Sequence, residues 1–530
     1  MVTGADWRAA LHLAWRREGH WWLAVAATCV AAFFLRLGAY PLFDLDEGAF
    51  SQATREMIAS GNYLATSLDG EPRYDKPIFS YWMQALSVHL FGPVEYAFRL
   101  PSALAAAAWV GAVFVFLRQR LDVATAGIAA LLLCLSLGPL MIGRAATADA
   151  WLNLWLALTF IEIARWRDAP RTATLLRAWL WMALGFLTKG PVAVVVPAAA
   201  SLICLLWDGR GRDWLRAAFD PRGWLVFAAV ALPWYGMILW QEGPGFFYGF
   251  FVEHNLQRFL ETREGHGGSV LYYLWALPLM LSPFAGWLLA VLPRCWRGPQ
   301  GLERLCWVWL GVVFVIFSFS GTQLPHYILY GVTPLLVVMA LHREQLRNIW
   351  LAFVPALLPF VLLLLVPEFL RLGLGLVDRA YETALIERGL DVFGPAYRAA
   401  VALFAVAALG VTLVSRWPVW RRLLVIGGLQ AAVLVMVFVP ALAETQQTPV
   451  KRAAEIARDS QRPVVATGIH MPTFSVYRGQ ATPRRMPEAG EVAVTREHVV
   501  ARIQARHDDR ELDILYREGG IVLIAVPVAP

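Results

Sequence analysis

The stretch AFRLPSALAAAAWVGAVFVFL at residues 97–117 decides the fold class. A helix that spans a bilayer needs about 20 consecutive and mostly apolar residues, so this stretch predicts a transmembrane helix. Outward from it in both directions, the same rule finds more candidates. They lie at about 21–39, 124–143, 147–164, 173–187, 190–207, 223–241, 270–292, 305–320, 326–341, 348–366, 396–414 and 422–441. We therefore expect an α-helical polytopic membrane protein with about 13 transmembrane helices.

The composition excludes most other classes of protein. Hydrophobic residues make up 58% of the 530 residues, charged residues only 16%, and the mean hydropathy is positive. Soluble domains are about one-quarter charged, so this chain cannot cover itself with polar surface. The five cysteines form no CxxC pair, which argues against a disulfide framework or a thiolate metal site. Soluble enzymes, nucleic-acid binders and secreted disulfide scaffolds are excluded.

The net charge of +7 is carried almost entirely by arginine in short loops between apolar stretches. Every second loop is basic, and cytoplasmic loops of membrane proteins carry the excess of Arg and Lys. The basic loops lie at 118–120, 165–171, 210–222, 294–304, 343–347 and 416–422. We therefore expect these loops and the N-terminus to face the cytoplasm. The alternate loops and the tail then face the other side of the membrane, the outside.

Two outer regions are long enough to hold structure of their own. In the first outer loop, at 40–96, the segments 47–60 and 78–91 are amphipathic and predict two helices lying along the membrane interface. The tail, at 444–530, changes composition and predicts a small α/β periplasmic domain. We expect its strands at 463–467, 491–495, 512–517 and 521–527, and its helices at 448–459 and 496–507. Residues 1–443 then form the membrane domain.

Acidic and basic residues from several separate outer loops are expected to meet on the outer face. The candidate catalytic carboxylates are Asp46, Glu47 and Asp149. The candidate substrate-binding residues are Tyr74, Lys76, Lys189, Arg258 and Tyr327. Two of the three lysines of the chain belong to this set, while the cytoplasmic loops offer mainly arginine.

Each residue of the set also has a purely structural interpretation. Asp46 and Glu47 lie where carboxylates cap a helix, and Asp149 opens a span in the same way. Lys76 is placed to anchor the chain at the interface. Lys189, which precedes Gly190 and Pro191, marks a helix break. The joint placement of all of them on one side of the membrane favours a functional site.

The segment DEGAFSQATREMIASGNYLATSLDGEPRYDKPIFSYW, at 46–82, resembles the lipid-A aminoarabinose transferases. Those proteins are GT-C glycosyltransferases that use polyprenyl-phosphate sugars, as the protein O-mannosyltransferases do. Further similar segments follow in the same order along the membrane part. They are RLPSALAA at 99–106, Asp149 at the start of a span, LTKGPVA at 187–193, NLQRFL at 255–260 and LPHYIL at 324–329.

The resemblance implies particular roles for these residues. Asp46 corresponds to the catalytic carboxylate, and Lys76 and Arg258 would hold the phosphate of the donor. Asp75, together with Glu253 or His254, would bind a divalent metal ion. The chain departs from the family pattern at Ala49-Phe50, where an Arg-Tyr pair is usual, and at Asp75, where Glu is usual.

The sequence thus predicts an inverting glycosyltransferase of the bacterial inner membrane with its active site facing the periplasm. It would move a pentose or hexose, with 4-amino-4-deoxy-arabinose as one candidate, from a polyprenyl-phosphate carrier to an envelope acceptor such as lipid A in lipopolysaccharide. Its partners would be the lipid-linked donor, the envelope lipid or glycan acceptor and membrane lipids, and not nucleic acid. Two alternatives stay open, a transporter or flippase of lipid-linked sugars and an enzyme like the protein O-mannosyltransferases. Transporters tend to place polar residues at mid-membrane, and here they cluster at the outer ends of spans.

Overall fold

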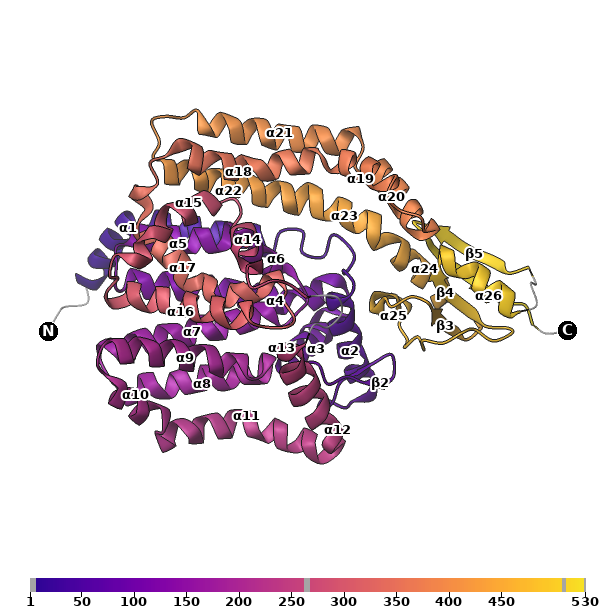
Figure 1. The fold of residues 1–530 in the computed structure, drawn as a ribbon, viewed down its shortest axis with the longest axis horizontal. Coiled ribbons are helices and arrows are strands. Elements are labelled where there is room, and N and C mark those ends of the chain that lie inside the picture. The colour runs from indigo at the N-terminus through magenta and orange to yellow at the C-terminus, as the bar shows by residue number, and fades with distance from the viewer. Residues whose placement is uncertain (1–5, 262–266, 508–510, 529–530) are drawn as a thin grey trace.

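The computed structural model describes residues 6–261, 267–507 and 511–528. Most of the chain forms helices that run side by side in a bundle, and a small β-sheet lies beyond one end of it (Figure 1). We name this end of the bundle the sheet end. The opposite end, at which α10 lies, is named the basic end, because the arginine-rich loops gather there (Figure 1).

Every apolar stretch expected to span the membrane coincides with a helix or with a bent run of helices. The single helices are α1 (Asp6–Phe33), α4 (Glu95–Arg118), α7 (Asp149–Asp168), α8 (Thr172–Lys189), α9 (Val192–Trp207), α11 (Pro221–Glu242), α16 (Gly301–Ser318), α18 (Ile349–Leu364) and α21 (Pro395–Thr412). The divided ones are α5 (Val123–Leu135) with α6 (Leu137–Arg144), α14 (Tyr272–Met280) with α15 (Ala285–Val291), η3 (Pro325–Gly331) with α17 (Val332–Leu341), and α22 (Val419–Val433) with η5 (Leu434–Phe438) and α23 (Val439–Gln446). Short helices α10 (Gly211–Ala218), η2 (Leu292–Trp296) and η4 (Arg343–Gln345) lie in the basic loops.

Several of the helices are bent or short, and this reduces the number that meet a simple length criterion. The α5–α6 pair bends by 63° at Ser136, whose backbone is extended, and the α14–α15 pair bends by 118° near Pro283. Proline removes a backbone donor and disrupts the helical ladder. Within the described ranges, five helices are long and apolar enough to cross a membrane when α22, η5 and α23 count as one helix. The number rises to as many as eight when each of three bent pairs also counts as one span, the third pair being Ile349–Leu364 with Val366–Leu374.

The basic loops meet one another through ion pairs at the basic end. Arg120 pairs with Asp168, and Arg167 Nε lies 2.6 Å from Asp208 Oδ2. Arg304 Nη1 lies 2.5 Å from the other oxygen of Asp208. Loops that are distant in sequence but equally rich in arginine therefore share one end of the bundle, as the alternation predicts.

The first outer loop lies at the sheet end and contains the two expected helices. They are α2 (Asp46–Ser60) and α3 (Phe79–Phe91), and a short hairpin of β1 (Ser67–Leu68) and β2 (Glu71–Pro72) that the sequence did not predict lies between them. Helix α2 ends at Gly61, which has a φ of 69°. This left-handed conformation favours glycine and stops the helix. The second long outer loop forms α12 (Pro244–Phe246), η1 (Phe247–Gln257) and α13 (Arg258–Leu260), and its residues 262–266 lie outside the described ranges.

The chain beyond α23 forms a four-stranded sheet in the order β3-β4-β6-β5. Its elements are α24 (Thr448–Arg458), β3 (Val464–Thr467), α25 (Pro472–Arg478), β4 (Val492–Arg496), η6 (Glu497–Val499), α26 (Val500–Arg506), β5 (Asp513–Glu518) and β6 (Ile521–Ala525). Strand β3 runs parallel to β4, and the other pairs are antiparallel. The expected strands and the two expected helices are therefore present, whereas α25 was not predicted.

The sheet shares a hydrophobic core with the bundle. Val492 and Leu523 of the sheet pack in one buried cluster with Leu42, Phe98 and Ala146 from the bundle and its first outer loop. Two further helices that the sequence missed, α19 (Val366–Leu374) and α20 (Ala380–Val392), lie between α18 and the sheet (Figure 1). The sheet is thus attached to the bundle by packing as well as by the chain.

Candidate active site

A cavity of about 520 Å³ at the sheet end contains most of the predicted substrate-binding residues. Its polar lining comes from the first outer loop, the α8–α9 turn, η1, α13 and η3. These lining residues are Asp75, Lys76, Lys189, His254, Asn255, Arg258, Ser320, Tyr327 and Tyr330. The remaining wall is apolar and is formed mainly by α9 and α16, with Val192, Val195, Val196, Phe251, Phe259, Ile316 and Phe317. The cavity therefore combines a cationic lining with an apolar one.

Lys189 lies at the end of α8 and forms an ion pair with Asp149, the first residue of α7. The distance from Lys189 Nζ to Asp149 Oδ1 is 2.5 Å, and the Tyr330 hydroxyl donates to the same oxygen at 3.3 Å. The turn after Lys189 depends on Gly190, whose φ is 78°, and a Cβ there would lie 2.7 Å from the ring of Phe250. Gly190 therefore allows the tight turn between α8 and α9, and the preceding residue, Lys189, lines the cavity.

Asp75 lies at the centre of a group of cations. Its carboxylate is 2.9 Å from Arg73 Nη2 and 3.1 Å from His254 Nε2. Burial by itself would raise the pKa of Asp75, but Arg73, Lys76, His254 and Arg258 hold it below its usual range. Asp75 is therefore ionised, and it gathers positive groups from the first outer loop and from η1–α13 around one point.

Lys76 lies next to Asp75 and lines the cavity. Its ammonium donates to the backbone carbonyl of Asp75 at 3.1 Å. Burial lowers the pKa of Lys76 to about 8, against the opposing effect of Asp75, and the nearby cations Lys189 and Arg258 lower it further. A lysine in this state is charged at neutral pH and would gain stability from a bound anion.

Asp46 begins α2 and does not act as an N-cap. The N-cap is Leu45, no side chain caps the helix there, and Asp46 is exposed. Its carboxylate contributes to the electrostatic environment of Arg73 and His326, which lie around the cavity. The capping interpretation therefore accounts poorly for this residue, although its charge still suits the positive end of the helix dipole.

Glu47 is the buried partner of Arg99, a residue whose role the sequence analysis missed. Glu47 is 5% exposed and Arg99 is 0% exposed. The two carboxylate oxygens accept from Arg99 at 2.8 and 2.7 Å, and they also accept from the backbone N–H groups of Phe43 and Ala146. Both oxygens of Glu47 are thus occupied, which argues against the catalytic role predicted for it. The sequence position of Arg99 could have indicated its role, because Arg99 is a charged residue within an apolar span and such residues are usually paired.

The other N–H groups of the Arg99 guanidinium bind the segment that connects α1 to α2. These groups donate to the carbonyls of Leu37, Tyr40 and Pro41 at 2.8 to 3.1 Å. Since these carbonyls precede Asp46 by only a few residues, the Arg99–Glu47 pair fixes the position of the start of α2.

The same loop is bound to α25 beneath the sheet. Asp44 accepts from the backbone N–H of Thr473 at 3.0 Å, and Arg55 donates to the carbonyls of Ser475 and Gly479 at 3.0 and 2.7 Å. Gly48 has no room for a side chain, because a Cβ would lie 2.5 Å from Asp44 Oδ1 and 2.8 Å from Thr473. The segment around Asp46 is therefore fixed by contacts with the bundle, through Arg99, and by contacts with the C-terminal domain, through Thr473.

Five of the predicted residues do not line the cavity, namely Asp46, Glu47 and Asp149, described above, and Tyr74 and Glu253. The Tyr74 hydroxyl donates to Glu242 of α11 at 2.8 Å, and its ring packs against Phe246 of α12. Tyr74 therefore attaches the first outer loop to the second. Glu253 is exposed and does not line the cavity. Both facts argue against the roles predicted for Tyr74 and Glu253.

The residues around Asp75 do not fit a divalent metal ion. The described part of the chain contains no group of three or more His, Cys, Asp or Glu side chains that could hold one. Divalent ions such as Mg²⁺ prefer several oxygen ligands. Asp75 instead supplies a single carboxylate among several basic side chains, and Glu253 is exposed and does not line the cavity.

Fold and site together define a helical membrane protein with a cationic cavity and an apolar wall at one end of its bundle. A family model described as dolichyl-phosphate-mannose-protein mannosyltransferase matches residues 75–240. The chain is also similar to undecaprenyl phosphate-alpha-4-amino-4-deoxy-L-arabinose arabinosyl transferases. The protein from Yersinia enterocolitica is 30% identical over 61% of this chain, and that from Edwardsiella ictaluri is 29% identical over 62%. The chain spans 60% of the length of each of these relatives.

A solved structure has the same fold over nearly the whole chain. The crystal structure of ArnT from Cupriavidus metallidurans bound to undecaprenyl phosphate matches with a TM-score of 0.77 and 21% identity, over 96% of this chain and 99% of that one. These comparisons confirm the resemblance to the aminoarabinose transferases and the polyprenyl-phosphate-dependent mannosyltransferases, and they confirm that the chain has the ArnT fold.

Proposed function

We propose that this protein is an inverting glycosyltransferase that moves one sugar from a polyprenyl-phosphate carrier to an acceptor in the cell envelope. The single observation that carries the proposal is one cavity lined both by the cations Lys76, Lys189 and Arg258 and by apolar residues of α9 and α16. A lipid-linked sugar phosphate has the matching two-part chemistry. The similarity to arabinosyl transferases and the fold of a protein solved with undecaprenyl phosphate support the same reading.

In the proposed reaction, an oxygen of the acceptor attacks the anomeric carbon of the sugar. A new C–O bond forms as the bond from that carbon to the phosphate oxygen breaks, and the bonding electron pair moves onto the departing polyprenyl phosphate. Lys76 and Arg258 stabilise the charge that develops there, since preorganised cations act strongly in a site that excludes water. Arg258 can hold two phosphate oxygens at once. A single displacement inverts the configuration of the sugar.

Three carboxylates have different roles in this proposal. Asp46 receives the proton when the acceptor is a hydroxyl, and it orients the acceptor when that group is already an ionised phosphate. Asp149 orients Lys189 through their 2.5 Å contact. Glu47 acts as a positioning residue, because Arg99 occupies both of its oxygens.

The position in the cell follows from the same proposal. We infer that all of the apolar stretches, about 13, cross the inner membrane, with the basic end in the cytoplasm and the sheet end in the periplasm. The cavity then opens toward the periplasmic side, where envelope lipids are modified. The names of the relatives favour an amino-pentose as the sugar. For the acceptor we propose lipid A or a related lipopolysaccharide component, which the resemblance seen in the sequence implies.

A mannosyl donor is a second candidate, because the family model with that description covers residues 75–240. That range includes Lys76 and Lys189, which are proposed to bind the phosphate, and Asp149, which orients Lys189, and it ends before Arg258. The two candidates therefore share the phosphate chemistry and differ in the sugar.

The test is transfer by the purified full chain in detergent from polyprenyl-phosphate 4-amino-4-deoxy-arabinose to lipid A, with polyprenyl-phosphate mannose in parallel. We expect turnover with one donor, and Lys76→Met should reduce it severely because the cation at the phosphate is lost. Lys451→Met removes a lysine that pairs with Glu95 at 2.7 Å outside the cavity and should retain turnover. Absence of transfer from both donors by folded wild-type protein would refute the proposal.

A further inference from the structure

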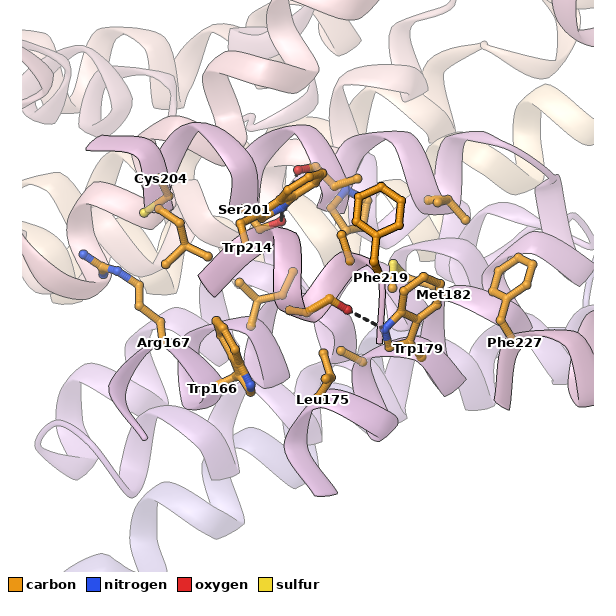
Figure 2. Close-up of a pocket in the computed structure, with 18 of the residues that line it drawn as sticks. Trp166, Arg167, Leu175, Trp179, Met182, Ser201, Cys204, Trp214, Phe219 and Phe227 are labelled. Atoms are coloured by element: carbon orange, nitrogen blue, oxygen red, sulfur yellow. Dashed lines mark hydrogen bonds between the residues drawn. The ribbon is translucent and has the colours of Figure 1, made fainter. Parts of the chain in front are cut away.

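A second pocket lies at the basic end of the bundle, between α7, α8, α9, α10 and α11. It has a volume of about 290 Å³, and we name it the tryptophan pocket after Trp166, Trp179, Trp214 and Trp224, which line it. Figure 2 shows Trp214 and Phe219 on one side of it and Trp166 and Leu175 on the other. It is separate from the catalytic cavity, because Pro197, Ala198 and Ser201 of α9 line the pocket whereas Val192 and Val195 line the cavity.

Several polar atoms around the tryptophan pocket are already hydrogen-bonded within the protein. Trp214 Nε1 donates to Ser201 Oγ at 3.1 Å, and that hydroxyl donates to the carbonyl of Ala198 at 3.1 Å. Trp179 Nε1 donates to the carbonyl of Ala217 at 3.4 Å (Figure 2). Buried water needs two to four polar partners, and apolar cavities stay dry. A ligand that fits here therefore needs no hydrogen-bonding groups.

An empty pocket of this size is also unfavourable, because protein interiors pack densely and unfilled space loses dispersion contacts. Phe219 and Trp224 are 70% and 51% exposed, so the pocket borders the surface of the bundle from which bilayer lipid can enter. A hydrocarbon chain satisfies both conditions.

The charges next to the pocket favour an anionic headgroup. Arg167 lines the pocket and shares the single carboxylate of Asp208 with Arg304. Glu162, one residue before the lining residue Ile163, is likewise shared by two arginines, Arg165 and Arg177. Each carboxylate therefore leaves one positive charge uncompensated, which suits a phosphate diester at the membrane surface.

We propose that the tryptophan pocket binds one acyl chain of an anionic glycerophospholipid, whose phosphate lies beside the Arg167–Asp208–Arg304 group. This inference does not rest on the proposed sugar transfer. It assigns a lipid site at the end of the bundle opposite to the catalytic cavity, where the lipid fills the space between α8, α9 and α11 and holds α10 against them.

The test measures lipid retained by the purified full chain, and the probe is palmitoyl-oleoyl phosphatidylglycerol. Protein washed free of lipid is incubated with the probe and analysed by native mass spectrometry. We expect the wild type to retain about one such lipid per chain more tightly than phosphatidylcholine. Ala198→Phe, which fills the pocket, should lose it, and so should the smaller change Ala178→Leu. Ile203→Phe, at an exposed apolar position of α9 outside the pocket, should keep it.

The headgroup is tested with Arg304→Gln, which should abolish the preference for phosphatidylglycerol while an acyl chain is still retained. Size-exclusion profiles and thermal unfolding identify any variant that does not fold. If only one of Ala198→Phe and Ala178→Leu folds, that variant alone tests whether the filled pocket loses the lipid. Equal retention by folded Ala198→Phe or Ala178→Leu and by wild type would overturn the proposal. Displacement of the lipid from wild type by polyprenyl phosphate at equal concentration would also overturn it, because the pocket would then belong to the donor.

Discussion

The depressed pKa of Lys76 predicts the alkaline side of the pH–rate profile. The pKa of Lys76 in the free protein is about 8, which leaves the ammonium about 90% protonated at pH 7 and about 10% protonated at pH 9. A depressed lysine keeps its charge below this pKa and loses it above. Since kcat/KM reports groups of the free enzyme, it should be level below pH 8 and then fall about tenfold for each further pH unit.

The perturbation is Lys76→Arg, which keeps a cation that does not titrate in this range. The decline of kcat/KM above pH 8 should disappear, even when the longer and planar group lowers the rate at every pH. Lys76→Met should be slow throughout and equally level. Lys451→Arg is the matched control, since Lys451 pairs with Glu95 outside the cavity and should keep the wild-type profile. The assay is initial transfer rate at subsaturating donor between pH 6 and 10. A wild-type decline that persists in both Lys76 variants would refute the reasoning.

The other predictions concern the carboxylates, the topology and the sheet. Asp46→Asn should reduce transfer by roughly 10²–10⁴-fold with folding intact, and near-normal turnover would leave this residue only an electrostatic role at the helix terminus. Arg99→Met should lower the unfolding free energy by about 3–5 kcal/mol, because Glu47 would stay buried without its partner, and this is measured by unfolding in detergent beside the double variant with Glu47→Gln. A periplasmic reporter such as alkaline phosphatase fused after the C-terminus should be active, whereas activity of a cytoplasm-only reporter there would contradict the topology. Arg485→Ala breaks a partly buried pair with Glu491 and should weaken transfer only in part, so complete loss in a folded variant would assign the sheet a catalytic group.

The elements that the sequence predicted well are those with a strong local signal. The apolar stretches coincide with helices because length and hydropathy determine them, and β3, β4 and β6 follow from short runs of Val, Ile and Ala. Helices α19 and α20 were missed, because they carry charged residues and pack on distant segments. They pack on each other, and α20 also packs on α23 and pairs with β5 through Arg388 and Glu518. The break at Ser136 was missed as well, since nothing in an apolar stretch indicates where its helix bends.

The sequence predicted which residues form the candidate site better than it predicted which of them contact one another. Spacing and sidedness indicated that Lys76, Lys189 and Arg258 would meet, and all three line one cavity. The partners of each acid could not be read from the sequence, because they depend on contacts between distant segments. Glu47 is therefore neutralised by Arg99 from α4, while Asp46 beside it is exposed. Neighbouring residues on a helix face different directions, and this separates the two acids.

The attachment of the sheet has a consequence for how the chain can be divided. Leu42 and Phe98 of the bundle are buried against Val492 and Leu523, and Asp44 and Arg55 bond directly to α25. A protein that ends near residue 443 would expose this shared surface and would release the first outer loop on one side. The part of the chain after residue 443 therefore forms one of the surfaces on which the first outer loop packs. An exchange of this part between relatives should succeed only when the first outer loop is exchanged together with it.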